Sequence, residues 1–373
     1  MEPSESNKKP SIIIDNGSGF CKAGFSGEKE PKTIFSTRVG YPKTRGCSGF
    51  VKKECFIGKK AESIIRVLDI YYPIKKGIIT NWDEMENIWK HIFGNELYVS
   101  PEEHSVFLTG VPFNSNQNRE KLAQIIFEHF NVPELYIENQ SLLAANYFGK
   151  TTGIILDCGD SNPSCVPIVE SIPISNAIHY LNFSGRELTE YMAEILAETG
   201  FSFDTEYKKL ILQKIKEKAC YVALDYEREL KSFEPYDYEL PDGANIIIKS
   251  QRIRCTEPLF NQSIMSKEGK GIAEICLESI QNCDKNLEKE FYNNIILSGG
   301  NTMYEGFPER LSKEMKILAP QSMKDEVKVL ASNERKLAAW KGASILSTTS
   351  LFDNRWITKK EYEEKGCSII HKN

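Results

Sequence analysis

Two short acidic segments that contain glycine constrain this chain more than any other feature. They are residues 15–19 (DNGSG) and residues 157–161 (DCGDS), and each follows an apolar run rich in β-branched residues, at 12–14 and at 154–156. Such runs predict buried strands, and the glycines predict that a tight turn leaves each strand. The chain therefore repeats one local arrangement in its two halves.

These turns suit the binding of phosphate. Glycine lets the backbone approach an anion closely and direct N–H groups toward it, while a carboxylate at the end of a strand can hold hydrated Mg²⁺ through its water shell. One such segment would be weak evidence, because Asp-Asn-Gly is also an ordinary hairpin turn. Two of them predict a nucleotide held between the halves. An alternating strand at 20–25 would return Lys22 to the same phosphates, and the alternative for Lys22 is a solvated side chain.

Length and composition define the class of protein. The 373 residues exceed what one hydrophobic core usually holds, about 250 to 300 residues, so two or more domains are expected. Lys and Arg total 47 against 52 Asp and Glu, a net charge of −5, which disfavours a primary role in binding nucleic acid. The first residues have no apolar signal core, and no stretch approaches the ~18 apolar residues of a membrane helix. We expect neither secretion nor a membrane span.

Strands and helices are predicted to alternate along the chain, which indicates the α/β class. Residues 119–129 predict a helix with Leu122, Ile125, Ile126 and His129 on one face, followed by a break at Pro133 and a strand at 135–137. The ten cysteines are scattered without any Cys-x-x-Cys pair. This distribution favours buried reduced thiols over a disulfide framework or a zinc site.

The first acidic segment and many later ones resemble the actin family. The matching segments, which occur in family order with small changes of spacing, are residues 15–25, 72–74, 77–83, 118–121, 216–218, 220–225, 240–243 and 297–300. On these matches the chain is identified as a member of the family, a divergent actin or actin-related protein.

The resemblance implies the actin-like ATPase fold. This is an α/β architecture of duplicated ribonuclease-H-like domains, with four subdomains around a nucleotide cleft. The implied boundaries are residues 1–36, 73–147 and 338–373 for subdomain 1, 37–72 for subdomain 2, 148–183 and 268–337 for subdomain 3, and 184–267 for subdomain 4.

The resemblance also implies a ligand and the residues that bind it. The ligand is ATP or ADP with Mg²⁺ (or Ca²⁺), and Asp15 and Asp157 would hold the metal through water. The residues implied to bind the nucleotide are Asp15, Gly17, Ser18, Gly19, Lys22, Gly159, Asp160, Ser161, Gly185, Arg186, Lys216, Glu217, Gly299, Gly300, Met303, Tyr304 and Lys336. Taken singly, many have an ordinary alternative: a Lys-Glu-Lys run on a helix is usually a solvated face, and methionine is usually core. Their joint occurrence in family order carries the assignment.

The implied catalytic residues are Gln140, Asp157 and Ser164, and here the chain departs from the family. Gln140 matches the glutamine that orients the attacking water. Ser161 replaces a glycine, Pro163 removes a backbone N–H, and Ser164 replaces a water-orienting histidine. Loss of one such partner typically costs about 10²–10⁴-fold in rate. The sequence therefore predicts ATP binding with slow Mg²⁺-dependent hydrolysis.

Three functions are compatible with these residues. The first is an ATP-binding cytoskeletal protein, either a specialised filament-forming actin or an actin-related subunit, with itself, actin or actin-binding proteins as partners. The second is a fixed, ATP-bound structural subunit of a cytoskeletal or chromatin complex. The third is an ATPase of the sugar-kinase or chaperone type, which the lack of their substrate-binding insertions disfavours. The expected location is the cytoplasmic cytoskeleton, with the nucleus as the alternative.

One further segment bears on assembly. Residues 40–49 form a polar, turn-rich stretch that predicts a mobile loop. In actin the matching loop grips the neighbouring subunit of a filament, and here Cys47 and Ser48 replace its apolar tip. Less apolar surface would be buried at such a contact. A weaker or different polymer contact is the resulting hypothesis.

Overall fold

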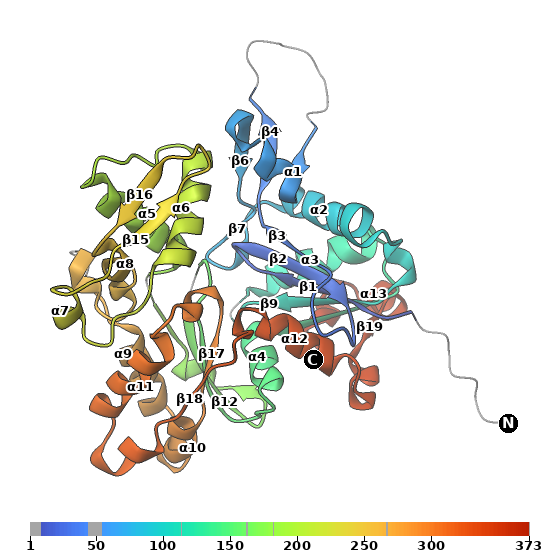
Figure 1. Ribbon diagram of the computed structural model, residues 1–373. Helices are drawn as coiled ribbons and strands as arrows, with labels where there is room; N and C mark the ends of the chain where they lie inside the picture. The colour runs from blue at the N-terminus through green and yellow to red at the C-terminus, as the bar shows by residue number, and fades with distance from the viewer. Residues whose placement is uncertain are drawn as a thin grey trace.

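The computed structural model describes residues 9–43, 54–112, 114–161, 163–181, 183–265 and 268–372. Two mixed sheets form its core, with a pair of helices between them and further helices on their outer faces (Figure 1). Three smaller sheets lie outside this core, and two of them can be followed in Figure 1 above and beside it. The architecture is α/β, as the alternation of elements predicts.

The first large sheet has the strand order β19-β10-β9-β1-β2-β3. Its strands are β1 (Ile12–Asn16), β2 (Phe20–Phe25), β3 (Thr33–Ser36), β9 (Val106–Gly110), β10 (Glu134–Asn139) and β19 (Ile357–Thr358). Strand β1 is antiparallel to β2 and parallel to β9. All five residues of β1 are buried, which agrees with its apolar, β-branched sequence.

The second large sheet repeats this arrangement. Its order is β13-β12-β11-β17-β18, with β14 paired to β12. The strands are β11 (Gly153–Asp157), β12 (Ser164–Val169), β13 (Ile172–Pro173), β14 (His179–Tyr180), β17 (Ile295–Ser298) and β18 (Val329–Leu330). Strand β11 is antiparallel to β12 and parallel to β17, as β1 is to β2 and β9. Both predicted acidic segments therefore follow the same kind of strand.

Helices α4 (Gln140–Tyr147) and α12 (Ala338–Leu346) form the layer between the two sheets. Leu143 and Trp340 pack into the apolar cluster of the first sheet, whereas Ala144 and Ala338 pack into that of the second. The two helices approach backbone to backbone: a Cβ atom at Gly342 would lie 1.8 Å from the carbonyl oxygen of Leu143. Only glycine fits there, so this residue sets the spacing between the two halves.

Two outer lobes extend the halves. The first outer lobe contains the sheet β5-β4-β6 and helix α1, and the second contains the hairpin β15-β16 with helices α5 and α6 (Figure 1). Their bounds are β4 (Val39–Pro42), β5 (Phe56–Ile57), β6 (Leu68–Tyr71), α1 (Gly58–Ser63), β15 (Tyr236–Glu239), β16 (Asn245–Ile248), α5 (Gly185–Ala197) and α6 (Glu206–Ala219). The lobes meet where the Arg66 guanidinium lies 3.9 Å from the Tyr207 ring centroid and the Tyr72 hydroxyl donates to Glu206 at 2.7 Å.

The remaining regular elements cover the outer faces of the sheets or connect the lobes. They are β7 (Ile74–Lys75), β8 (Ile78–Ile79), α2 (Trp82–His91), α3 (Asn116–Glu128), α7 (Tyr226–Glu229), α8 (Gln251–Arg254), α9 (Ile272–Gln281), α10 (Glu288–Asn293), α11 (Phe307–Leu318) and α13 (Lys359–Lys365). Within the described ranges, none of the helices has the length and apolar character needed to cross a membrane.

Some sequence predictions need correction or fall outside the described residues. Helix α3 begins earlier than predicted, because the Ser115 side chain accepts from the Asn118 N–H at 3.2 Å and caps it. His129 follows the helix, with its exposed imidazole beside Glu86, and does not face the core. Residues 40–42 of the predicted mobile loop belong to β4, and residues 44–53 are not described. The nine described cysteines are unpaired thiols.

Candidate functional site

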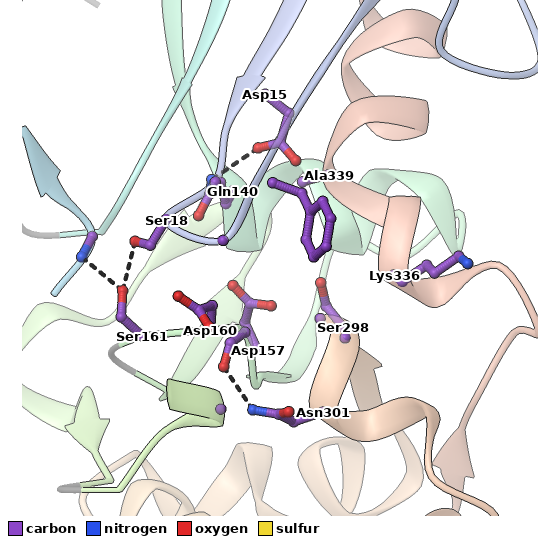
Figure 2. Close-up of a pocket in the computed structure, with 18 of the residues that line it drawn as sticks. Asp15, Ser18, Gln140, Asp157, Asp160, Ser161, Ser298, Asn301, Lys336 and Ala339 are labelled. Carbon is purple, nitrogen blue, oxygen red and sulfur yellow. Dashed lines mark hydrogen bonds between the residues drawn. The ribbon is translucent and has the colours of Figure 1, made fainter. Parts of the chain in front are cut away.

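A cavity of about 520 Å³ lies between the two halves, with the two acidic segments facing each other across it (Figure 2). We call residues 15–19 the first loop and residues 157–161 the second loop. Every residue predicted to bind nucleotide or to take part in catalysis lines this cavity, with the exception of Arg186. Residues that are distant in sequence therefore meet at one place in the fold.

The end of β1 fixes the first loop. Asp15 is only 2% exposed and accepts three hydrogen bonds, from Lys22 Nζ at 2.5 Å, Thr109 Oγ1 at 2.6 Å and Gln140 Nε2 at 2.9 Å. Burial raises the pKa of Asp15, but the Lys22 charge and these donors outweigh it and hold the pKa below its ordinary value. Lys22 is placed by the register of β2 opposite Asp15, as the alternating strand predicts.

The end of β11 carries a carboxylate in a different state. Burial raises the pKa of Asp157 above its ordinary value, and the nearby negative charge of Asp15 adds to this, against a hydrogen bond from Ser298 and the positive charge of Lys22. The parallel pairing of β11 with β17 brings Ser298 opposite Asp157. Asp157 thus lines the cavity with its charge poorly compensated by the protein. A cation or its water shell is what such a group lacks.

The two loops touch at their tips. A Cβ atom at Gly19 would lie 2.7 Å from the Cβ atom of Asp160, so a side chain at this position would push the loops apart. Ser18 and Ser161 also meet, since Ser161 Oγ donates to Ser18 Oγ at 2.5 Å (Figure 2). The cavity is consequently closed at the loop tips by direct contact between the halves.

The opposite side of the cavity is built from α5, α6 and the 3₁₀ helix Gly300–Met303. Lys216 is buried and its Nζ donates to the Gly185 carbonyl at 2.7 Å, so it ties α6 to the start of α5. It is not the solvated lysine that a Lys-Glu-Lys run usually indicates. Asn301 Nδ2 donates to the Gly159 carbonyl at 2.7 Å and connects this side to the second loop (Figure 2).

Arg186 has a different position from the other predicted site residues. Its guanidinium donates to the Asp160 carboxylate at 2.9 Å and lies 4.7 Å from the centroid of the Tyr72 ring. These contacts link the second loop to the end of the first outer lobe. A direct contact of Arg186 with a nucleotide stays a prediction.

The residues predicted to be catalytic lie together on the cavity lining, and none of them is a histidine. Gln140 Nε2 is occupied by Asp15 and by Thr109 Oγ1, at 3.2 Å. Ser164 is buried and opposite Asp157 in the pairing of β11 with β12. No histidine lines the cavity within the described part of the chain. The site therefore has groups that can orient water but no imidazole that titrates near neutral pH.

The lining also includes residues that were not predicted from the sequence, namely Asn16, Phe20, Ile34, Gly77, Val111, Pro112, Gln213, Ser298, Asn301, Leu337 and Ala339. Ser298 and Asn301 flank the predicted Gly299 and Gly300, and proximity in sequence could have identified them. Gly77 and Val111 carry no phosphate-binding signal of their own. Only the folding of their segments toward the loops brings them to the cavity.

The residues present fit a nucleotide with a hydrated divalent cation. Two buried polar atoms of the lining, Asn16 Nδ2 and the Tyr304 hydroxyl, have no hydrogen-bond partner among the described residues. Gly159 would meet no atom within 4 Å if it carried a Cβ, so its backbone is open to an approaching group. The lining combines ammonium groups, carboxylates and an apolar wall, which suits phosphate, metal and a flat base respectively.

Comparison with known protein families gives one match. The family model described as Actin matches residues 6–373, which is nearly the whole chain. Both loops, the helix pair α4 and α12 and both outer lobes lie within the matched range.

Proposed function

Because this chain belongs to the actin family, we propose that it binds ATP or ADP with Mg²⁺ (or Ca²⁺) in the cavity between its halves and acts as an actin-like cytoskeletal protein. The observation that carries the proposal is the pair of loops facing each other across the cavity, one with an aspartate whose pKa its partners lower and one with an aspartate whose pKa stays raised. Proteins of this family generally bind nucleotide with a divalent cation, and the donor set described above agrees with that ligand.

Each side of the cavity has a proposed role. The backbone N–H groups of the two loops and the ammonium of Lys22 bind the phosphates. Asp157 and Asp15 would hold the metal through its water shell. Glu217 accepts from the ribose hydroxyls, while Met303, Tyr304 and the aliphatic part of Lys336 form the wall for adenine; Gly185, Gly299 and Gly300 leave room for the backbone to approach.

Hydrolysis is proposed to be slow. Gln140 is retained, but its amide nitrogen is held by Asp15 and Thr109, which leaves its carbonyl oxygen as the group that can orient a water molecule. Ser164 and Ser161 do not titrate near neutral pH. Without a histidine to position the water, turnover depends on Gln140 alone and falls by the roughly 10²–10⁴-fold that such partners contribute.

The absence of a histidine from the described lining also supports a second role. A fixed subunit of a cytoskeletal or chromatin complex needs the nucleotide as a structural ligand and gains nothing from turnover. Bound nucleotide stabilises the fold by about 2.7 kcal/mol at a hundredfold excess over its Kd. The partners are then other subunits of the complex, whereas a filament-forming protein would bind copies of itself or actin.

Calorimetric titration with Mg²⁺-ATP tests the proposed ligand. We expect one site in the wild-type protein, and Asp157→Asn should weaken binding about 10- to 100-fold, the contribution of a charged interaction. Asp237→Asn is the matched control, because Asp237 is an exposed residue of strand β15 in the second outer lobe, and this substitution should leave Kd unchanged. Absence of binding to the wild type, or equal effects of the two substitutions, would refute the assignment.

A further inference from the structure

A single hydroxyl joins three segments of the cavity wall. Ser161 Oγ donates to Ser18 Oγ at 2.5 Å and accepts from the Gly77 N–H at 3.2 Å (Figure 2). Ser18 belongs to the first loop, Ser161 to the second loop, and Gly77 to the turn between β7 and β8. All three residues line the cavity. The contact therefore crosses the gap between the two halves.

The hydrogen bonds of Ser161 leave it no donor for a ligand. A serine hydroxyl has one hydrogen and two lone pairs. In Ser161 the hydrogen is donated to Ser18, and one lone pair accepts from Gly77. The one capacity left to Ser161 Oγ is a second lone pair, which cannot donate to a phosphate oxygen and repels one that approaches it. Ser161 can donate to a phosphate oxygen only if its hydrogen bond to Ser18 breaks.

The position of this contact relates it to the length of the phosphate chain. Figure 2 shows Lys336 at one side of the cavity and Ser18, Ser161 and Gln140 at the other. With adenosine beside Lys336, as proposed above, the phosphates extend toward the loop tips, and the last phosphate of a triphosphate comes closest to Ser161. A diphosphate ends earlier and leaves the Ser161–Ser18 hydrogen bond intact.

We propose that Ser161 is a specificity-determining residue that shifts the nucleotide preference of this cavity from triphosphate toward diphosphate. This inference rests on the proposed function and adds whether the site favours a nucleoside triphosphate or a diphosphate. The hydrogen bond between the two hydroxyls must be broken to bind ATP and is kept when ADP binds. Glycine at this position would place no lone pair there and would impose no such cost.

The test is a pair of dissociation constants, for Mg²⁺-ATP and Mg²⁺-ADP, measured by calorimetry on the wild type, Ser161→Gly and Ser161→Ala. Loss of a net hydrogen bond corresponds to about a fivefold to tenfold change in Kd. Both substitutions should tighten ATP by about that factor, with little change for ADP. Ser232→Ala, which removes an exposed hydroxyl bonded to the Arg228 carbonyl in the second outer lobe, is the control and should change neither constant.

The ratio of the two constants separates specificity from a structural effect. A substitution that merely loosens the fold weakens both nucleotides together, so an unchanged ratio in both variants would overturn the proposal. Weaker ATP binding in the variants would also overturn it, because Ser161 would then be a donor to the last phosphate. If the wild type binds neither nucleotide, the proposed function itself fails, and this result is distinct from an unchanged ratio.

Discussion

At the scale of single residues, the two aspartates at the ends of β1 and β11 have equivalent positions but opposite environments. Asp15 is paired with Lys22 and accepts two further hydrogen bonds, so its pKa lies below the ordinary value of 3.8. Asp157 is partly buried and lies near the like charge of Asp15, so its pKa lies above that value. The sequence identified both residues, because each follows an apolar strand. It could not reveal the difference, which depends on the partners that the fold supplies.

This difference predicts opposite effects on the stability of the nucleotide-free protein. The lowered folded-state pKa of Asp15 contributes stability above pH 3.8, and this stability is lost as the pH falls through the folded-state pKa. The raised folded-state pKa of Asp157 has the opposite effect, because the folded protein loses stability as the pH rises from 3.8 through that pKa. Asp15→Asn should therefore destabilise the protein at pH 7, by about 3 kcal/mol, because it also leaves Lys22 unpaired. Asp157→Asn should stabilise it at pH 7.

Thermal unfolding of both variants and of the wild type from pH 3.5 to pH 8, without nucleotide or divalent metal, measures these differences in stability. The gain of Asp157→Asn over the wild type should shrink toward pH 3.5, where the wild-type carboxyl is mostly protonated in the unfolded state as well as in the folded state. If both variants were less stable than the wild type at neutral pH, the environments assigned to the two aspartates would be wrong.

At the scale of elements, the close contact of α4 with α12 determines how the two halves are spaced. Gly342→Ala would place a methyl group 1.8 Å from the Leu143 carbonyl oxygen, and the helices would have to separate. We expect a loss of at least about 1–3 kcal/mol in the free energy of unfolding, the usual cost of overpacking. Gly94→Ala is the matched control, because no atom lies within 4 Å of a Cβ at Gly94.

Urea denaturation of the two variants compares these costs directly. Since α12 follows the segment that contains Lys336, separation of the helices should also weaken nucleotide binding by Gly342→Ala but not by Gly94→Ala. Equal stability of the two variants would mean that the helix contact does not set the spacing.

Some of these elements could be predicted from the sequence, and others could not. Strands β1, β2, β10 and β11 follow from apolar runs and from alternation, and the structure confirms them. The start of α3 was missed, because Ser115 as a cap outweighs the pattern that begins at Arg119. The parallel pairing of β1 with β9 and of β11 with β17 joins segments far apart in the chain. Local pattern contains no information on such pairs.

At the scale of the whole molecule, the two outer lobes meet at Tyr72, which also contacts a neighbour of the second loop. Burial raises the pKa of Tyr72 to about 12 against the opposing charge of Arg38, so its hydroxyl stays protonated and donates to Glu206. The same ring lies beside Arg186, which binds Asp160 of the second loop. Tyr72 therefore joins both lobes and the loop.

Tyr72→Phe should accelerate the dissociation of bound nucleotide by about fivefold, since it removes one net hydrogen bond between the lobes. Displacement of a fluorescent ATP analogue by excess ATP measures this rate. Tyr207→Phe keeps the ring that stacks on Arg66 and is the control. The same dissociation rate in Tyr72→Phe and the wild type would exclude the lobe contact as a barrier to release.

The central claim is that the two loops hold a nucleotide that the protein hydrolyses slowly. The most direct measurement is to load the protein with radiolabelled Mg²⁺-ATP, remove unbound nucleotide by gel filtration, and follow bound label and phosphate release in one sample. The account predicts one nucleotide per chain and cleavage at roughly 10⁻³ to 10⁻¹ per second, which is the 10²–10⁴-fold reduction applied to an ordinary turnover of about ten per second. Elution without nucleotide, or complete cleavage within seconds, as expected of an ordinary enzyme that turns over about ten times per second, would contradict it.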